Sequence, residues 1–199
     1  MAFVRRQNWI VWLGLGALGG VMFTAFWPNT PLHAVATDHG ENFAMATGAV
    51  DDTTEAVFLL DFLSGNLRGA VLSNQSRGFQ AMYEANVLAD LANSVTVLNA
   101  KVRQENLARK KQGVPARPDV QVPQNPRFLM VTGNCDLRRG AARLRPGRSV
   151  LYVAETTTGL VLAYVIPWSS EQHVSDMAFQ GKLILWAGDQ FATTVVRAE

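Results

Sequence analysis

The chain has 199 residues and a net charge of +2, with 48% apolar and 17% charged residues. This length allows one membrane segment and one domain of ordinary size, and the composition excludes a globally disordered chain. Cys135 is the single cysteine, which excludes an intramolecular disulfide. We expect it to be either a small, half-buried apolar residue or a reactive thiol that could bridge two molecules.

The charges are distributed unevenly along the chain. Residues 28–100 carry two basic and eight acidic side chains, whereas residues 101–148 carry twelve basic and three acidic ones. Residues 149–199 return to a net charge of −3. A basic block therefore separates two acidic stretches, and this reversal is a feature that the fold or a partner has to explain.

The first 27 residues contain an uncharged run from Trp9 to Trp27. As a helix this run would span about 28 Å, close to the hydrocarbon thickness of a bilayer. Arg5 and Arg6 precede it, and no Lys or Arg occurs in residues 28–42. The positive-inside rule then predicts a single-pass membrane protein with a cytoplasmic N-terminus and an extracytoplasmic, periplasmic C-terminal domain.

Two further predictions concern this segment. The apolar run is longer than the core of a signal peptide, which favours an uncleaved anchor over cleavage after Ala36. Gly14, Gly16 and Gly19 spell the dinucleotide fingerprint G-x-G-x-x-G, but they lie inside the apolar run without a preceding strand, so we expect no nucleotide and no other cofactor. The Gly16–Gly20 spacing would let two membrane helices approach, which makes a homo-oligomer one option.

The next part of the chain changes from irregular to strand-like. Residues 28–50 show no sustained periodicity and are expected to form a spacer. Ala56–Leu60 and Leu67–Leu72 flank turn chemistry at residues 63–66 and predict a β-hairpin. Phe79–Tyr83 predicts a further short strand.

A helical period follows, with apolar residues on one face and polar residues on the other. The helix should end at Gly113, and the four prolines of residues 113–126 predict an extended, mobile loop. The apolar positions are Val87, Leu91, Val95, Leu98 and Val102.

Strand signals resume at Phe128–Thr132. Val150–Glu155 and Leu160–Ile166 predict a second hairpin, and Lys182–Trp186 with Phe191–Val196 predict a third. The expected fold class is α+β: an N-terminal transmembrane helix, then a mainly antiparallel sheet of six or seven strands with one principal amphipathic helix. The predicted domain boundaries are 1–27 for the anchor, 28–50 for the spacer and 51–199 for the extracytoplasmic domain.

The first two hairpins resemble each other at a separation of 94 residues. Asp61 then matches Glu155, and Gly65 matches Gly159. A carboxylate at a strand end can accept hydrogen bonds from turn amides, and glycine supplies the positive φ that a tight turn needs. Turn mechanics explain the pair better than a site of two opposed carboxylates.

This acidic-x-x-hydroxyl-Gly turn is similar to a blade hairpin of bacterial quinoprotein-type β-propellers, over two stretches of 17 residues in a chain too short for a propeller. The whole-chain layout resembles a group of uncharacterised single-pass bacterial envelope proteins. It shares with them the apolar span, the hairpin at Glu55–Leu72, the FLMVTG strand at Phe128–Gly133 and the SVLYVAETTTG stretch at Ser149–Gly159. That resemblance implies no activity.

A polar cluster follows Trp168. Ser169, His173 and Asp176 are the residue types of a hydrolase triad, but triad members normally lie far apart in sequence. The stretch after Pro167 is more simply a polar connection. No metal site is expected, because His33 and His39 are far from other ligand types.

The arginine-rich block suits anionic partners, because guanidinium groups bind phosphate and carboxylate oxygens in pairs. Export would exclude nucleic acid and favour anionic lipid, wall polymer or an acidic protein surface. The alternative is that the acidic residues 28–100 or a neighbouring copy neutralise the block. Its members are Arg138, Arg139, Arg143, Arg145 and Arg148.

The sequence therefore favours a membrane-tethered interaction or structural module of the bacterial envelope, with a protein partner and no catalysis. The alternatives are an envelope hydrolase using Ser169, His173 and Asp176, and an anion-binding accessory protein using the Arg138–Arg148 block.

Overall fold

The computed structural model describes residues 13, 14, 16, 17, 37–137 and 145–192. The chain divides into two compact units, Met1–Ala34 and Val35–Glu199, and the fold below is that of the second unit. Its architecture is mainly antiparallel β-sheet with few helices, which confirms the α+β class.

The predicted membrane topology is contradicted. Within the described residues, no helix combines the length and the apolar character needed to cross a bilayer. The helix at Val87–Lys111 is long but carries charges throughout, and the helix at Ser170–Val174 has five residues. The run from Trp9 to Trp27 on which the single-pass, periplasmic prediction rested lies outside the described residues, apart from four positions.

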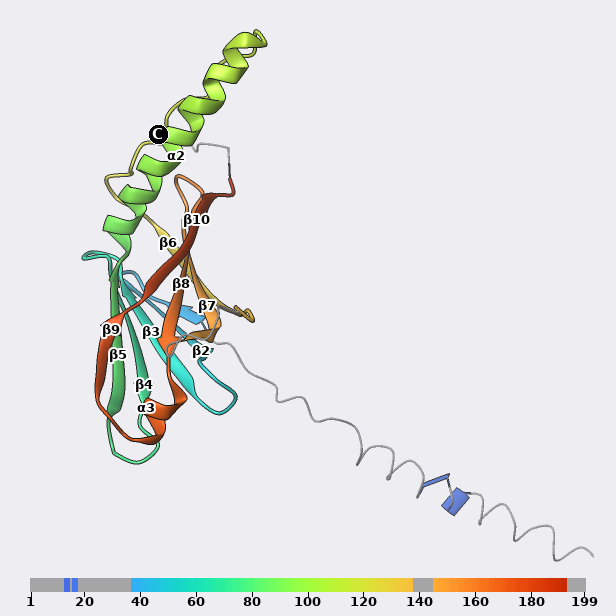
Figure 1. The fold of residues 1–199 in the computed structure, drawn as a ribbon, viewed down its shortest axis with the longest axis vertical. Coiled ribbons are helices and arrows are strands. Elements are labelled where there is room, and N and C mark those ends of the chain that lie inside the picture. Colours follow the sequence, from blue (N-terminus) through green and yellow to red (C-terminus); the bar gives the residue numbers. More distant parts are fainter. Residues whose placement is uncertain (1–12, 15, 18–36, 138–144, 193–199) are drawn as a thin grey trace, which may run out of the picture. The chain divides into compact units, whose positions relative to one another are not determined.

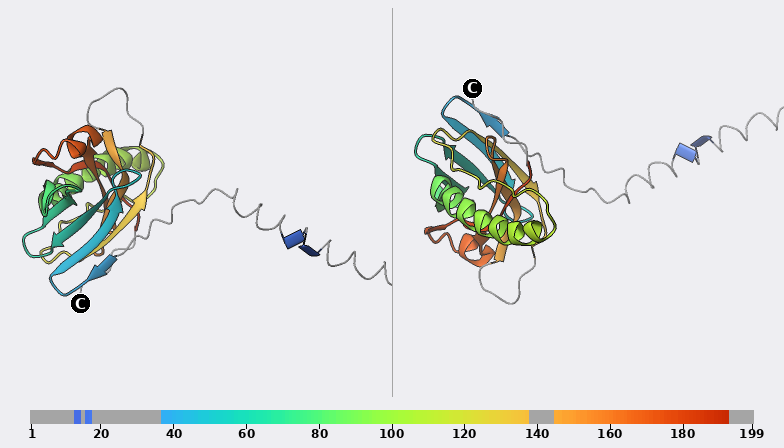
Figure 2. Two further views of the ribbon diagram at one scale, coloured as in Figure 1. Left: turned by 90° about the horizontal axis from the view of Figure 1, so that it is seen from below. Right: turned by 90° about the horizontal axis from the view of Figure 1, so that it is seen from above.

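The described strands form two sheets that lie face to face (Figures 1 and 2). One sheet has the order β1-β2-β3-β4-β5-β9 and the other the order β10-β8-β7-β6. Every pairing is antiparallel except that of β5 with β9. The bounds are Thr37–His39 (β1), Phe43–Ala49 (β2), Glu55–Asp61 (β3), Asn66–Leu72 (β4), Phe79–Asn86 (β5), Phe128–Asn134 (β6), Arg145–Glu155 (β7), Leu160–Trp168 (β8), Phe179–Lys182 (β9) and Ile184–Gln190 (β10).

The two sheets contain equivalent four-stranded meanders, β2-β3-β4-β5 and β6-β7-β8-β10. Their registers match as well as their order, so the likeness predicted between the two hairpins is confirmed and extends to the flanking strands. The equivalent opposed pairs are Phe43 with Asp61 and Phe128 with Glu155, and Asn66 with Asn86 and Leu160 with Gln190.

The same turn closes the central hairpin of each meander. Asp61 Oδ1 accepts a hydrogen bond from the Leu63 amide at 2.9 Å, and Glu155 Oε2 accepts one from the Thr158 amide at 2.7 Å. Gly65 and Gly159 follow at φ 67° and 68°, and each donates its amide to the carbonyl of the strand-end acid at 2.9 Å. Because a side chain is strained at such a φ, both positions favour glycine.

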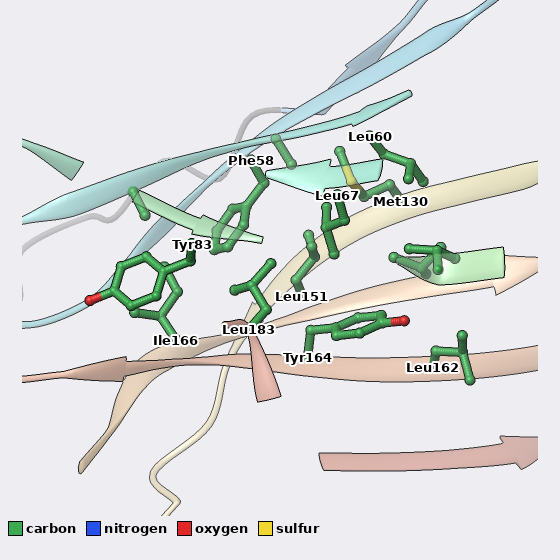
Figure 3. Close-up of a cluster of buried hydrophobic side chains, with 14 of the residues drawn as sticks. Phe58, Leu60, Leu67, Tyr83, Met130, Leu151, Leu162, Tyr164, Ile166 and Leu183 are labelled. Atoms are coloured by element: carbon green, nitrogen blue, oxygen red, sulfur yellow. The ribbon is translucent and has the colours of Figure 1, made fainter. Parts of the chain in front are cut away.

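The core lies between the sheets and draws side chains from both (Figure 3). Two tyrosines are buried there with their hydroxyls paired: Tyr164 Oη donates to Asp90 Oδ2 at 2.9 Å, and Tyr83 Oη donates to the Pro167 carbonyl at 2.9 Å. Paired hydroxyls let large aromatic rings fill the core without an unsatisfied polar group. Its largest fully buried apolar members include Phe58, Leu60, Leu67, Leu151, Leu162 and Ile166.

Both sides of the sandwich are closed by local features. On one side, β9 and β10 follow each other with only Leu183 between them, so the chain passes directly from one sheet into the other. On the other side, Thr132 Oγ1 donates to the Thr47 carbonyl and Ser149 Oγ donates to the Ala49 carbonyl. A Cβ on Gly48 would lie 2.5 Å from Ser149 Oγ, so this close contact requires glycine.

The principal helix, α2 (Val87–Lys111), was predicted correctly. Asn86 caps it by accepting the Ala89 amide at 2.8 Å. Val87, Leu91 and Val95 are buried against the sandwich. The rest of the helix extends past the ends of the strands (Figure 1). We call residues 96–122, which comprise this projecting part and the chain that returns along it, the arm.

The returning chain, residues 113–122, forms a strap along α2 and corrects the prediction of a mobile loop. Each of two asparagines pairs its side-chain amide with both backbone groups of one strap residue: Asn106 with Arg117 at 2.7 and 2.8 Å, and Asn99 with Val120 at 2.8 and 2.9 Å. Seven helical residues rise about 10.5 Å, which matches three extended residues at about 3.3 Å each. Val102, between the two asparagines on this face, is 1% exposed.

Two other segments differ from the prediction. The predicted spacer 28–50 contains β1 and β2; the alternation of β2 is hard to see because its buried residues are Ala44 and Ala46. The predicted third hairpin is instead one strand, β10, which runs through the expected turn and pairs with β8 as far as Gln190. Residues 193–199 lie outside the described residues.

The strap gives a testable prediction. Asn106→Ala removes two hydrogen bonds that each contribute about 0.5–1.5 kcal/mol, so tryptic cleavage at Arg109–Lys111 should accelerate by about tenfold. The melting temperature should change little, because the arm lies outside the core. Asn93→Ala, on the exposed face of α2, is the control; equal proteolysis of both variants would contradict this account.

Candidate functional site

The residues of the predicted hydrolase do not assemble into a triad. Ser169 is the N-cap of α3 (Ser170–Val174), with its Oγ accepting the Gln172 amide at 3.5 Å. Asp176 Oδ1 accepts a hydrogen bond from Ser73 Oγ at 2.6 Å. His173 is 7% exposed and packs on Trp168 with 5.1 Å between ring centroids. Each of the three side chains thus has its own structural partner.

The surroundings of His173 also leave no space for a substrate. Gln80 of β5, which the sequence did not single out, donates its Nε2 to the carbonyls of Gln172 at 3.0 Å and His173 at 3.1 Å and so holds α3 on the sheet. Gln80 Oε1 and His173 Nδ1 are buried without a hydrogen-bond partner. The hollow between these residues measures about 10 Å³, room for one water at most.

The two strand-end carboxylates are fully engaged in their turns. The hydrogen bonds from Ser64 and the Leu63 amide lower the pKa of Asp61 below its ordinary value. Burial raises the pKa of Glu155, but the hydrogen bonds from Thr158, Thr157 and Arg127 outweigh it, so this pKa is also lowered. Carboxylates held ionised by turn amides stabilise those turns and are poor general acids.

The arginine block is described only at Arg145 and Arg148, because Arg138, Arg139 and Arg143 lie outside the described residues. Arg148 forms an ion pair with Asp52, which belongs to the acidic part of the chain. Its backbone amide also donates to the Val50 carbonyl at 3.1 Å. This arginine is therefore neutralised within the chain, as the alternative interpretation expected.

Cys135 is a free, half-buried cysteine. It packs with Leu137 and Trp186 against Val150, Ala163 and Val165, an apolar cluster on the outer face of the four-stranded sheet. This placement agrees with the expectation of a small, half-buried apolar residue.

No group of three or more metal-ligating side chains occurs in residues 37–137 and 145–192. His33 lies outside the described residues, and the side chain of His39 is not described.

The arm carries the densest group of basic side chains in the described chain. Two of them are paired, Arg103 with Asp119 at 2.8 Å and Arg117 with Glu105 at 3.0 Å. These pairs fasten the strap to the helix. Lys101, Arg109, Lys110 and Lys111 form no ion pair within the described residues, although Arg109 Nε donates to the Pro115 carbonyl at 2.9 Å.

Apolar side chains accompany these cations. Leu107 is 67% exposed and Val114 40% exposed, on either side of the helix end. The tip of the arm therefore combines positive charge with apolar surface, a composition that a partner could cover.

A cleft of about 920 Å³ opens at the same end of the sandwich, beside the first residues of β6. Its walls combine aromatic, aliphatic and proline side chains with a few polar ones, and its volume falls within the range of binding clefts. The lining includes Glu41, Phe62, Leu63, Leu88, Pro123, Pro126, Arg127, Phe128 and Leu129.

No protein-family model, no curated protein and no solved structure matches this chain. The resemblances to propeller-blade hairpins and to single-pass envelope proteins therefore stay predictions, and the site has to be argued from its own geometry.

Glu155 gives a prediction for the turns. Because its pKa is lowered in the folded state, its contribution to stability is fully present above its ordinary pKa and is lost as the pH falls through the lowered value. At pH 7, Glu155→Gln should lower the free energy of unfolding by about 1.5–3 kcal/mol, the contribution of a hydrogen-bonded charge. The difference from the native chain should shrink in acid, as measured by urea denaturation at pH 7 and pH 3. Glu55→Gln, at an exposed strand start, should have little effect at either pH; a Glu155→Gln effect independent of pH would contradict the mechanism.

Proposed function

We propose that this protein is a non-catalytic interaction module that presents its α2 arm to an acidic surface of a protein partner. The observation that carries the proposal is the arm itself: a stiffened, cation-rich projection beyond the body of the sandwich. The argument has three steps, concerning its cost, its rigidity and its chemistry.

The arm contributes little to the core. Of the apolar residues in its helical part, Val102 alone is fully buried, and the strap covers it. Ordering a segment of this length costs conformational entropy at every residue. A projection that is ordered without adding to the core is better explained by what it contacts outside the domain.

The arm is also held in one shape. The paired asparagines and the two ion pairs fix the strap along two turns of α2. A rigid binding element loses less entropy when it meets its partner than a flexible one does. The tip can therefore be placed at a fixed distance from the body.

The chemistry of the tip favours a protein over a polyanion. Lys110 and Lys111 suit carboxylates, while Leu107 and Val114 need apolar side chains to cover them. Protein interfaces combine apolar contacts with complementary charge, whereas a phosphate backbone offers charge alone.

The two alternatives have less support. Ser169, His173 and Asp176 are occupied by structural contacts around a hollow of about 10 Å³. The anion-binding function of the Arg138–Arg148 block stays a prediction: Arg148 is paired with Asp52, and three of its five arginines lie outside the described residues.

Site-specific photocross-linking in the cells that make the protein tests this function. A photoreactive residue at position 107 should cross-link to a discrete acidic protein, and Lys110→Glu with Lys111→Glu should reduce that product at least tenfold. The matched control is position 72, where Leu72 is 61% exposed at the far end of β4. The same products from both positions, or a yield unaffected by charge reversal, would rule out the arm as the contact.

A further inference from the structure

The two sheets have four edge strands, and three of them carry features that discourage pairing with another chain. β1 has three residues, and β9 has four and ends in Lys182. β10 contains a β-bulge between Leu185 and Ala187 and lies against α2, so that a Cβ on Gly188 would be 3.0 Å from Ser94 Oγ. Short length, lysine, bulges and covering helices are how natural proteins protect sheet edges.

β6 has none of these features. It is seven residues long, its sequence FLMVTGN contains no charge and no proline, and it ends the order β10-β8-β7-β6. In the described part of the chain, β6 pairs with β7 and with no strand on its other side. Its free edge is therefore a template for another strand.

The face that β6 shows to solvent is apolar as well. Leu129 is 60% exposed and Val131 51% exposed, and Val131 lies opposite Tyr152 of β7, which is 36% exposed. The outward positions of β6, β7 and β8 between Phe128 and Val165 include no charged residue. Strands that are apolar on both faces are typical of sheets covered on both faces, whereas this face stays partly open.

We propose that a second copy of the chain covers this edge, with the two β6 strands pairing antiparallel about a two-fold axis at Val131. The two four-stranded sheets then join into one sheet of eight strands. Backbone groups along both edges become hydrogen-bonded, and the contact closes on itself as an isologous dimer. This dimer is independent of the acidic partner proposed for the arm, because it uses a different surface.

The occupant is a second copy because β6 is complementary to itself. Two-fold pairing brings each residue near its own counterpart, and a strand without charge makes no like-charge contact. Val131 meets the second copy's Val131, a favourable β-branched pair. Leu129 meets the second copy's Gly133, whose missing side chain leaves Tyr152 within 3.3 Å of the ideal Cβ position as an apolar surface.

The strand ends are complementary in charge. The same register brings exposed Arg127, which precedes β6, to the end of the strand where the second copy's Asp136 lies. Opposite charges at both ends favour the antiparallel register over a slipped one. A contact of seven residues lies at the small end of protein interfaces, so we expect a dissociation constant on the order of micromolar.

Cysteine cross-linking of the full chain tests the register. In a Cys135→Ser background, Val131→Cys places two thiols across the axis, where opposed Cα atoms of antiparallel strands lie about 4.5–5.5 Å apart, within disulfide reach. Mild oxidation at about 50 µM, above the expected dissociation constant, should convert most of the chain into a covalent dimer. Leu129→Cys in the same background is the matched control: it is on the same face and more exposed, but it lies four residues out of register with its counterpart and should not cross-link. Equal cross-linking at both positions would indicate random collision and overturn the proposal.

Sedimentation equilibrium provides the second measurement. Val131→Lys places two like charges across the axis and should weaken dimerisation at least tenfold, while Leu63→Lys, at a 79% exposed turn position, should leave it unchanged. Circular dichroism checks that both variants fold. A native chain that stays monomeric up to about 200 µM, far above the expected dissociation constant, would overturn the proposal, as would a dimer insensitive to Val131→Lys. Protection of the β6 amides from hydrogen exchange only after an unrelated peptide is added would assign the edge to a foreign strand instead.

Discussion

The turn that ends β3 and β7 is the local interaction on which the rest of the structure depends. In both places a strand-end carboxylate accepts hydrogen bonds from the following amides, and a glycine at positive φ reverses the chain four residues later. Because side chains alternate between the two faces of a strand, a shift of one residue at this turn would move every apolar residue to the wrong face. The turn thus selects which residues of each meander enter the core.

The two meanders form one core because the chain connects the sheets at both sides. Leu183 lies where the strand passes from β5's neighbour to β8's neighbour, and it donates its amide to the Glu84 carbonyl at 2.9 Å. On the opposite side, hydroxyl groups of Thr132 and Ser149 satisfy carbonyls of β2 beyond the end of β1. With a single cysteine, the domain relies on this packing and hydrogen bonding for its stability.

Two surfaces remain that the core does not explain, and they differ in physical character. The arm is polar, projecting and held by side-chain hydrogen bonds and ion pairs, so charge governs what it can contact. The free edge of β6 is flat and uncharged, so backbone hydrogen bonding and apolar area govern what it can contact. Surfaces of such different chemistry favour different partners, and they lie on different elements of the same domain.

The sequence by itself determined the features that depend on neighbouring residues. The spacing of Val87, Leu91 and Val95 predicted α2, and the pattern of acid, hydroxyl and glycine predicted both turns, because helix periodicity and turn hydrogen bonding extend over only a few residues. The same reasoning failed where local signals are weak. β2 buries alanines, and Gly188 and Asp189 resemble a turn but continue β10 beside β8.

Only the tertiary structure decided what the polar residues do. Ser169, His173 and Asp176 have the composition of an active site, but the fold uses them as a helix cap, a ring contact with Trp168 and a hydrogen bond to Ser73. Asn99 and Asn106 gave no signal in sequence, because their partners lie 21 and 11 residues away. Which surfaces stay uncovered depends on long-range packing of both sheets and the helix, and so neither the arm nor the free edge of β6 could be derived from sequence patterns that extend over one or two turns.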